Sequence, residues 1–248
     1  MRRALLLFCA GVLASLLAGC AAHPKENLPA APPWKTTDDA LGILRDRAAA
    51  VKTVSSTGDI TLSRPSGDSV RLDLALVSQS PDRLRLRAWK LGRAVFDLTL
   101  TPQGLWLLTP DDPSLKNKAR AGGLDAAKLA RSWATFSGQL FSQPNVAVRE
   151  SGSSLIVTAP GEEGTTITCA IDRRTLTPRA YEVNDPAGKP RFTLQLSDYR
   201  LLDNIPYPFR YDATSESGKV RIDLRDVELN TDLAPAAFTP PKRAEKVS

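Results

Sequence analysis

The sequence predicts a mainly β protein with two or so helices, in which about 11 to 12 antiparallel strands form an unclosed barrel capped by a helical lid. Three observations lead to this fold class. Apolar and polar side chains alternate along most of the chain, turn-forming residues separate the alternating runs, and two stretches place apolar residues at helical spacing. So many antiparallel strands would curl into a barrel or a strongly bent sheet, and two helices would cap one opening of an incomplete barrel.

Residues 1–19 predict a secretory signal peptide. Two arginines precede an apolar run of about fifteen residues, which is shorter than the roughly 20 that a membrane-spanning helix needs. The run ends in the letters LAGC, the last of which is Cys20, and this ending resembles the lipobox of bacterial lipoproteins. The resemblance implies that a diacylglycerol is attached to Cys20, that the chain is cleaved before it, and that the new amino group is acylated. The alternative is an ordinary signal peptide with an incidental cysteine.

Residues 20–36 predict an extended tether, because four prolines in the stretch HPKENLPAAPPW disfavour both helix and sheet. Ala21 follows the cysteine at a position where Asp usually marks inner-membrane retention in enteric-type bacteria. The lipobox resemblance therefore implies an anchor in the outer membrane, with the protein facing the periplasm. The folded domain is expected at 37–240 and a disordered tail at 241–248. The full sequence has a modest formal net charge of +6, which does not suggest a nucleic-acid binder.

The histidine content argues against most enzyme classes. The only histidine, His23, lies in the tether, so the domain cannot build a Ser-His-Asp or Cys-His arrangement or an imidazole zinc site. Cys169 is the only cysteine within the domain and is expected to be a small buried residue. The acidic pairs at 111–112 and 162–163 lie among Pro or Gly and are expected to be solvated turn residues. The sequence therefore predicts no enzyme, no metal site and no cofactor apart from the lipid on Cys20.

Alternation is clearest in the first half of the domain. From Val70 to Leu76 every second residue is apolar, and Arg71 and Asp73 lie on the opposite face. Turns containing Pro, Gly, Ser and Asp separate this run from similar ones, which predicts sequential antiparallel neighbours. The further runs are RLRLRAWK, RAVFDLTLT and LWLLT, followed after residue 145 by VAVRE, SLIVTAP, TTITCAID, RAYEVND, RFTLQLSDY, PFRYDAT and KVRIDLRDVEL.

Two stretches carry the helical pattern. Residues 38–51 place four apolar side chains on one face, with two aspartates at the favourable N-terminal end. Residues 125–140 form a second stripe that includes Trp133 and Phe136. The commonest meaning of such stripes is core packing against the sheet.

This order of elements resembles the LolA/LolB superfamily of lipoprotein carriers, and the acylated start points to LolB. The segment 82–108 resembles a LolB segment in which two strands flank an Asn-Pro-Leu-Gly turn; here the turn is Trp-Lys-Leu-Gly, so only Leu91 and Gly92 match. The chain's ending also resembles that of the wider superfamily. The resemblance implies an unclosed barrel with a helical lid, a cavity for acyl chains, and a leucine, Leu91, that protrudes and passes lipoproteins into the membrane.

The resemblance implies a specific function: an outer-membrane-anchored monomer that accepts lipoproteins from a LolA-like periplasmic carrier and delivers their acyl chains to outer-membrane phospholipid. The expected cavity residues are Leu72, Leu74, Leu76, Leu84, Leu86, Phe96, Leu98 and Leu100, with Trp133 and Phe136 from the lid. Ordinary core packing would use the same residues. A scaffold or interaction module for envelope assembly is the alternative function from another class.

The turn at Leu91 also has two interpretations. Leu91 stands where turn chemistry favours polar residues, and Lys90 and Gly92 flank it. A surrounding collar of basic residues would suit contact with anionic lipid. Alternatively, Leu91 folds back onto Trp89 or Trp106, and the arginines only protect a solvated strand face from aggregation. The collar residues are Arg83, Arg85, Arg87 and Arg93.

Overall fold

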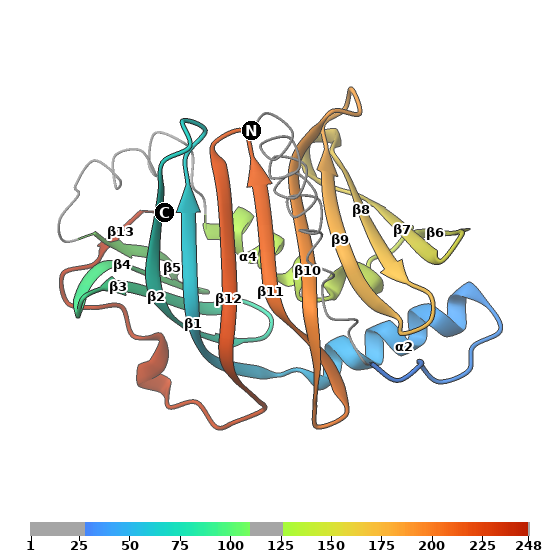
Figure 1. Ribbon diagram of the computed structural model, residues 1–248, viewed down its shortest axis with the longest axis horizontal. Helices are drawn as coiled ribbons and strands as arrows, with labels where there is room; N and C mark the ends of the chain where they lie inside the picture. The colour runs from blue at the N-terminus through green and yellow to red at the C-terminus, as the bar shows by residue number, and fades with distance from the viewer. Residues whose placement is uncertain (1–27, 110–125, 248) are drawn as a thin grey trace, which may run out of the picture.

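The computed structural model describes residues 28–109 and 126–247, which form one strongly bent antiparallel sheet with two α-helices on its concave side (Figure 1). The sheet has 13 strands among these residues. This confirms the predicted fold class. The strands are β1 (Thr53–Ser63), β2 (Ser69–Gln79), β3 (Arg83–Lys90), β4 (Arg93–Thr101), β5 (Gly104–Leu108), β6 (Ala147–Ser151), β7 (Ser154–Pro160), β8 (Thr166–Asp172), β9 (Thr177–Asn184), β10 (Pro190–Leu202), β11 (Ile205–Ser215), β12 (Gly218–Leu229) and β13 (Glu245–Lys246).

The strand order is β13-β5-β4-β3-β2-β1-β12-β11-β10-β9-β8-β7-β6. Sequential hairpins build both halves of the sheet, as expected, and the antiparallel pairing of β1 with β12 joins the halves. The bulge between Thr57 and Gly58 lies in this junction. A Cβ at Gly58 would lie 2.2 Å from the carbonyl oxygen of Asp223, so only glycine allows the two strands to approach this closely. β6 and β13 are the outermost strands, and the barrel stays open between them.

Helix α2 (Thr37–Ala50) begins with a capping box. The Asp39 amide donates to the Thr36 hydroxyl over 3.1 Å, and the Thr36 amide donates to the Asp39 carboxylate over 3.0 Å. The helix buries Leu41 and Leu44 against the sheet in a cluster with residues of β7 to β10. The apolar spacing predicted for 38–51 is therefore core packing.

Helix α4 (Ala126–Phe136) is shorter than the predicted 125–140. The chain turns at Gly138, which has a φ of 107°, and continues as a 3-10 helix at Gln139–Ser142. Two further 3-10 helices lie at Glu162–Gly164 and Pro235–Phe238. The positive φ at Gly138 explains why the helical stripe ends early.

Both ends of the described chain pack on the domain. Leu28 is buried, Ala31 donates its amide to the carbonyl of Arg174 over 2.8 Å, and Trp34 lies against the guanidinium of Arg173. Residues 28–34 of the expected tether are therefore attached to the turn between β8 and β9.

The prediction that 241–248 is a disordered tail is wrong for the described residues 241–247. Glu245–Lys246 pairs with β5 as β13, and the Val247 amide donates to the carbonyl of Leu105 over 2.8 Å. This short strand covers part of the β5 edge, which would otherwise present unpaired backbone groups. A polar, basic composition suggested disorder, but pairing with a buried strand edge orders the segment.

Three buried clusters form the core, and all their members lie between Leu28 and Val247. The first lies under α2 against β7 to β10, the second under α4 against β2 to β5, and the third along β1 to β4 with β11 and β12.

Candidate functional site

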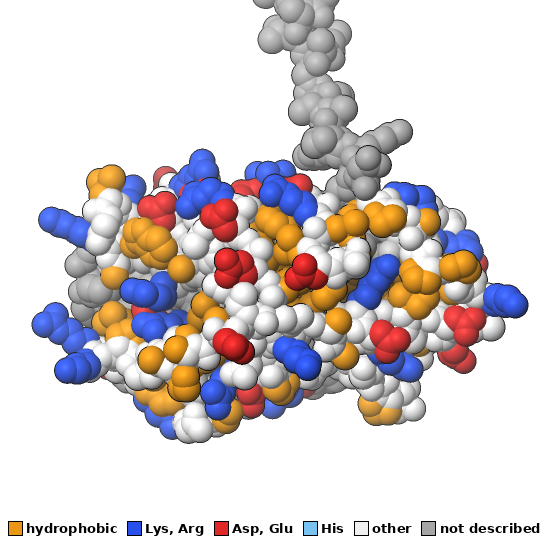
Figure 2. Space-filling model, turned by 90° about the horizontal axis from the view of Figure 1, so that it is seen from below, with side chains coloured by type: hydrophobic (Ala, Val, Ile, Leu, Met, Phe, Trp, Pro, Cys, Tyr) orange, Lys and Arg blue, Asp and Glu red, His pale blue; other side chains and the backbone are white. Residues whose placement is uncertain are grey.

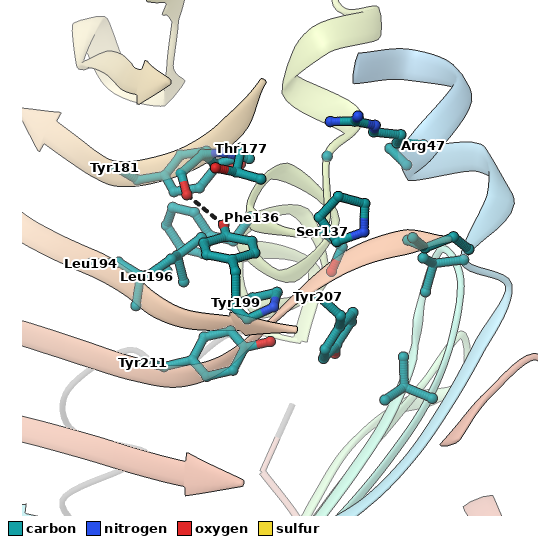
Figure 3. A pocket seen from close by; sticks show the side chains of 18 of the residues that line it. Arg47, Phe136, Ser137, Thr177, Tyr181, Leu194, Leu196, Tyr199, Tyr207 and Tyr211 are labelled. Atoms are coloured by element: carbon teal, nitrogen blue, oxygen red, sulfur yellow. Dashed lines mark hydrogen bonds between the residues drawn. The ribbon is translucent and has the colours of Figure 1, made fainter. Parts of the chain in front are cut away.

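A cavity of about 290 Å³ lies between the concave face of β9 to β12 and the C-terminal ends of α2 and α4 (Figure 3). Most of its wall is apolar. Figure 2, which shows the lower side of the molecule in Figure 1, shows hydrophobic side chains gathered in a hollow near the middle of this face. The lining residues are Leu44, Arg47, Ala48, Val51, Lys52, Val54, Ser78, Ser80, Trp133, Phe136, Ser137, Gly138, Phe141, Leu176, Thr177, Pro178, Tyr181, Leu194, Leu196, Tyr199, Ile205, Pro206, Tyr207, Pro208, Tyr211, Ala213, Val220 and Ile222.

Aromatic contacts attach the end of α4 to the sheet beside the cavity. The Phe136 ring packs edge-on against Tyr181, with ring centroids 5.3 Å apart, and stacks on Phe192 at 5.4 Å. Such pairs contribute about 0.5–1.5 kcal/mol each beyond the area they bury. Phe136 therefore both lines the cavity and holds this lid helix in place.

Helix α2 touches the turn that follows α4 at Gly138. A Cβ at this position would lie 2.5 Å from the Cβ of Ala48 on α2, which is closer than real side chains approach. Gly138 also has the positive φ that side chains disfavour. The glycine therefore permits close contact between α2 and the turn after α4, and both Gly138 and Ala48 line the cavity.

Four tyrosines, Tyr181, Tyr199, Tyr207 and Tyr211, line the cavity. Tyr199 donates its hydroxyl to the carbonyl of Pro178 (Figure 3). Burial raises the pKa of Tyr207, and it raises the pKa values of Tyr181 and Tyr211 well above the usual range. These phenols therefore stay neutral at physiological pH, so the tyrosines add hydrogen-bonding capacity without adding charge.

Two lining residues are charged, and both are basic. Arg47, in the last turn of α2, donates to the carbonyls of Thr175 and Leu176 over 2.7 and 2.9 Å. Burial lowers the pKa of Arg47, because removing water disfavours the charged form. Lys52 follows the helix and is exposed at the cavity mouth. Among the described residues that line the cavity, none is acidic.

The predicted cavity residues are only partly those that line it. Trp133 and Phe136 line the cavity, as expected. The eight strand residues do not, because they belong to the packed core of the other half of the sheet. Leu76, Leu84, Leu98 and Leu100 belong to the second core cluster, Leu72, Leu74 and Phe96 to the third, and Leu86 packs against both.

Sequence reasoning missed the residues of β9 to β12 that form the cavity floor. Leu194 and Leu196 alternate along β10, and Tyr207 and Tyr211 share one face of β11. The alternation that would have found them is present in the sequence. It marks the apolar face of a strand, but it does not show which part of that face a lid leaves uncovered.

Leu91 protrudes at the tip of the β3–β4 hairpin. Its side chain is 93% exposed, so it does not fold back onto Trp89 or Trp106. Leu91 and Gly92 have φ values of 51° and 75°, the pattern of a two-residue hairpin turn that normally prefers Asn-Gly. An exposed leucine with positive φ has no folding reason at this position.

The basic residues near the turn do not form the single collar that was expected. Arg85 is 15% exposed and makes two hydrogen bonds to the buried carboxylate of Asp97, which also pairs with Arg87. Arg83 lies at the opposite end of β3, about 26 Å along the strand from Leu91, and faces the ring of Phe238. Only Lys90 and Arg93 flank the tip directly, and both are exposed.

Several other sequence predictions concern single residues. Cys169 is fully buried, and burial raises the pKa of its thiol, in agreement with a structural role. The pair at 162–163 lies in a 3-10 turn. Cys20, His23 and the acidic pair at 111–112 lie outside the described residues.

Two features are absent from the described residues. Within 28–109 and 126–247, no helix combines the length and apolarity that crossing a membrane requires. No group of three or more His, Cys, Asp or Glu side chains in the same ranges is arranged to hold a metal ion.

Comparison with solved structures places the fold. A DUF1329 family protein from Desulfovibrio piger aligns with a TM-score of 0.61 and 12% identity, over 81% of this chain and 95% of that one. A putative outer membrane lipoprotein-sorting protein domain from Vibrio parahaemolyticus gives 0.56 and 16%, over 82% and 97%. A LolA superfamily protein from Nitrosomonas europaea gives 0.55 and 13%, over 84% and 99%.

Sequence comparison adds no relative, since neither a protein-family model nor a curated protein matches the chain. Identities of this size establish the fold alone. The chain has a LolA-like fold, an open antiparallel sheet bent around a lidded cavity.

Proposed function

We propose that this protein is a lipid-anchored acceptor that takes the acyl chains of lipoproteins into its cavity and delivers them to the inner leaflet of the outer membrane. The observation that carries the proposal is the apolar cavity of about 290 Å³ between the bent sheet and its helical lid. Its size is near the lower end of the range for small-molecule sites, about 300–1,000 Å³. A well-packed core leaves no such space.

An acyl chain would enter this cavity because burial removes apolar surface from water. Each buried methylene contributes about 0.8 kcal/mol. The floor offers Leu194 and Leu196, and the lid offers Trp133 and Phe136. A longer chain needs more room, which the ends of α2 and α4 provide when they separate at the Gly138–Ala48 contact.

Delivery to a bilayer would use the tip of the β3–β4 hairpin. Leu91 is exposed without a packing role, and Lys90 and Arg93 flank it. A basic residue near an anionic lipid surface contributes about 1 kcal/mol, and the leucine adds apolar contact. The tip is suited to touch the membrane while the cavity, on another part of the sheet, holds the chain.

Residue Cys20 is proposed as the lipid attachment site that fixes the protein to the outer membrane, facing the periplasm. In this arrangement a LolA-like soluble carrier brings the cargo, and the protein acts as a monomer without catalysis. The supporting observation is the LAGC ending of the apolar N-terminal run. Mass spectrometry of the mature N-terminal peptide tests it, and an unmodified cysteine would reject it.

Acyl binding is tested with Ala213→Phe, which adds a ring where Ala213 faces the cavity from β11. The variant should lose at least tenfold in affinity for a fluorescent fatty-acyl probe. The matched control is Ala187→Phe in the exposed β9–β10 turn, which should bind as the wild type does. Equal binding by the wild type and both variants would show that the probe does not enter the cavity.

Transfer is tested separately from binding. Leu91→Glu should keep the uptake of a lipoprotein from a LolA-type carrier and block its release into liposomes. The scaffold alternative predicts instead that the wild type binds no acyl probe, and that depleting the protein leaves other lipoproteins correctly sorted.

A further inference from the structure

We infer that the cavity is built for an amphiphile with an anionic head, carboxylate or phosphate, held at its mouth by Arg47 and Lys52. The inference rests on the proposed acyl-binding function and adds a ligand class to it. The lipid expected on a lipoprotein cysteine, an N-acyl group and a diacylglycerol thioether, carries no charge. A basic mouth therefore points to a second cargo, a fatty acid or a phospholipid.

The two charged residues of the cavity lining lie at one end of it, together with serine hydroxyls. β2 ends, and β9 and β11 begin, at the same end of the sheet, as the strand registers show. At this end lie Arg47, Lys52, Ser80 and Ser137, and the Ser80 amide donates to the carbonyl of Lys52 over 2.9 Å. The mouth thus combines two cations with hydroxyl groups.

The other end of the cavity is apolar. Ala213 on β11 pairs with Val220 on β12 and with Leu194 on β10, and all three line the cavity. From Pro206 at the mouth to Ala213, β11 rises about 23 Å. The cavity therefore has a long axis with charge at one end and hydrocarbon at the other, which matches the shape and polarity of an extended amphiphile.

Arg47 is the stronger of the two anchors. Its guanidinium is partly buried, and one nitrogen, Nη1, makes both hydrogen bonds to the backbone carbonyls. No carboxylate pairs with it among the described residues, and Figure 3 shows its side chain reaching from α2 beside the cavity. A guanidinium binds carboxylate and phosphate through paired hydrogen bonds, and a partly desolvated one gains most from an anionic partner.

The test uses residues 21–248, which are the mature chain without Cys20. The protein is loaded with a neutral fluorophore, N-phenyl-1-naphthylamine, and three twelve-carbon amphiphiles compete with the fluorophore at low salt and pH 8. Dodecanoate and dodecyl phosphate should displace it about tenfold more effectively than dodecanol, a difference of about 1.4 kcal/mol. High salt should reduce this preference. Preference for both anions indicates that the site recognises charge, and preference for dodecyl phosphate alone indicates a phospholipid head.

Combining Arg47→Gln with Lys52→Gln in one protein should reduce the preference for the anions over dodecanol to about onefold. Displacement of the fluorophore by dodecanol should stay as in the wild type. Arg149→Gln, an exposed arginine on β6, is the matched control and should keep the tenfold preference. If Arg47→Gln does not fold, Lys52→Gln and the wild-type ligand series decide, because Lys52 is exposed.

The outcomes separate this inference from the proposed function. If dodecanol displaces the fluorophore as well as the anions do, the anionic-head inference is wrong and the acyl cavity stands. If neither the fluorophore nor any amphiphile binds, the acyl-binding function itself is wrong, and the inference falls with it.

Discussion

Replacing Leu91 with asparagine should stabilise the domain and weaken its contact with lipid at the same time. The φ values of 51° at Leu91 and 75° at Gly92 define a turn that favours Asn-Gly. A side chain such as leucine costs about 1 kcal/mol or more in this left-handed conformation, and asparagine tolerates it. Because Leu91 is 93% exposed, the substitution removes no packing. We expect the free energy of unfolding to rise by about 0.5–1 kcal/mol.

The effect on lipid contact has the opposite sign. Moving a leucine side chain from water into an apolar environment contributes about 2 kcal/mol, which corresponds to roughly a 30-fold difference in partitioning. The substitution Leu91→Asn should therefore reduce release of acyl cargo into liposomes while leaving uptake of the acyl probe unchanged. Urea unfolding followed by tryptophan fluorescence measures the first quantity, and a liposome transfer assay measures the second.

The control is Leu201→Asn, which alters the other large hydrophobic side chain that is exposed among the described residues. Leu201 is 43% exposed on β10, so this change should cost some stability and leave transfer intact. A loss of stability in Leu91→Asn would show that Leu91 packs against the domain. Wild-type transfer by the same variant would show that the hairpin tip does not contact lipid.

The remaining predictions concern the lid and the core. Gly138→Val should destabilise the domain by about 1–3 kcal/mol in urea unfolding, because the new Cβ meets Ala48 and the φ is 107°; an unchanged midpoint would show that the lid helices yield freely. Thr36→Ala should cost about 1 kcal/mol through loss of the helix cap. Backbone amides that donate to the Asp39 carboxylate lower its pKa from the usual 3.8. The carboxylate therefore stabilises the fold above that pH, and this stabilisation is lost as the pH falls through the lower pKa of the folded state. The free energies of unfolding of the wild type and Asp39→Asn should accordingly become equal in acid. In the mature chain without Cys20, Cys169 should react with a thiol reagent at pH 8 at least 100-fold more slowly in buffer than in urea, because it is buried and its pKa is raised.

The strands and their order could be predicted because hairpins are local. Alternation and turn residues define each strand, and short connections make sequential strands pair. The pairing of β1 with β12 joins the two halves of the sheet. It brings together residues about 170 positions apart in the sequence, such as Thr57 and Asp226. No local pattern encodes that contact, and it was not predicted from the sequence.

The site could be predicted only in part. Its residues are of the same types as core residues, and the difference is only whether other parts of the protein pack over them. Leu74 and Leu196 have the same alternation, yet neighbouring hairpins cover the first and the second faces the cavity. Charge was equally ambiguous. Arg85 and Arg93 both looked like collar residues. The register of β3 with β4 places Asp97 opposite Arg87, where the Arg85 side chain also reaches it, and leaves Arg93 exposed at the tip.

Because residues 28–34 are attached to the β8–β9 turn, the tether by which a lipid on Cys20 would hold the domain is shorter than the sequence suggests. With a lipid on Cys20, only the eight residues 20 to 27 would separate the bilayer from Leu28, and a chain of eight residues reaches about 28 Å at most. The β8–β9 turn and Leu91 lie at opposite ends of the strands and in opposite halves of the sheet (Figure 1). If Cys20 carries a lipid, a domain held so close to the bilayer would have to lie on its side for Leu91 to reach the same membrane.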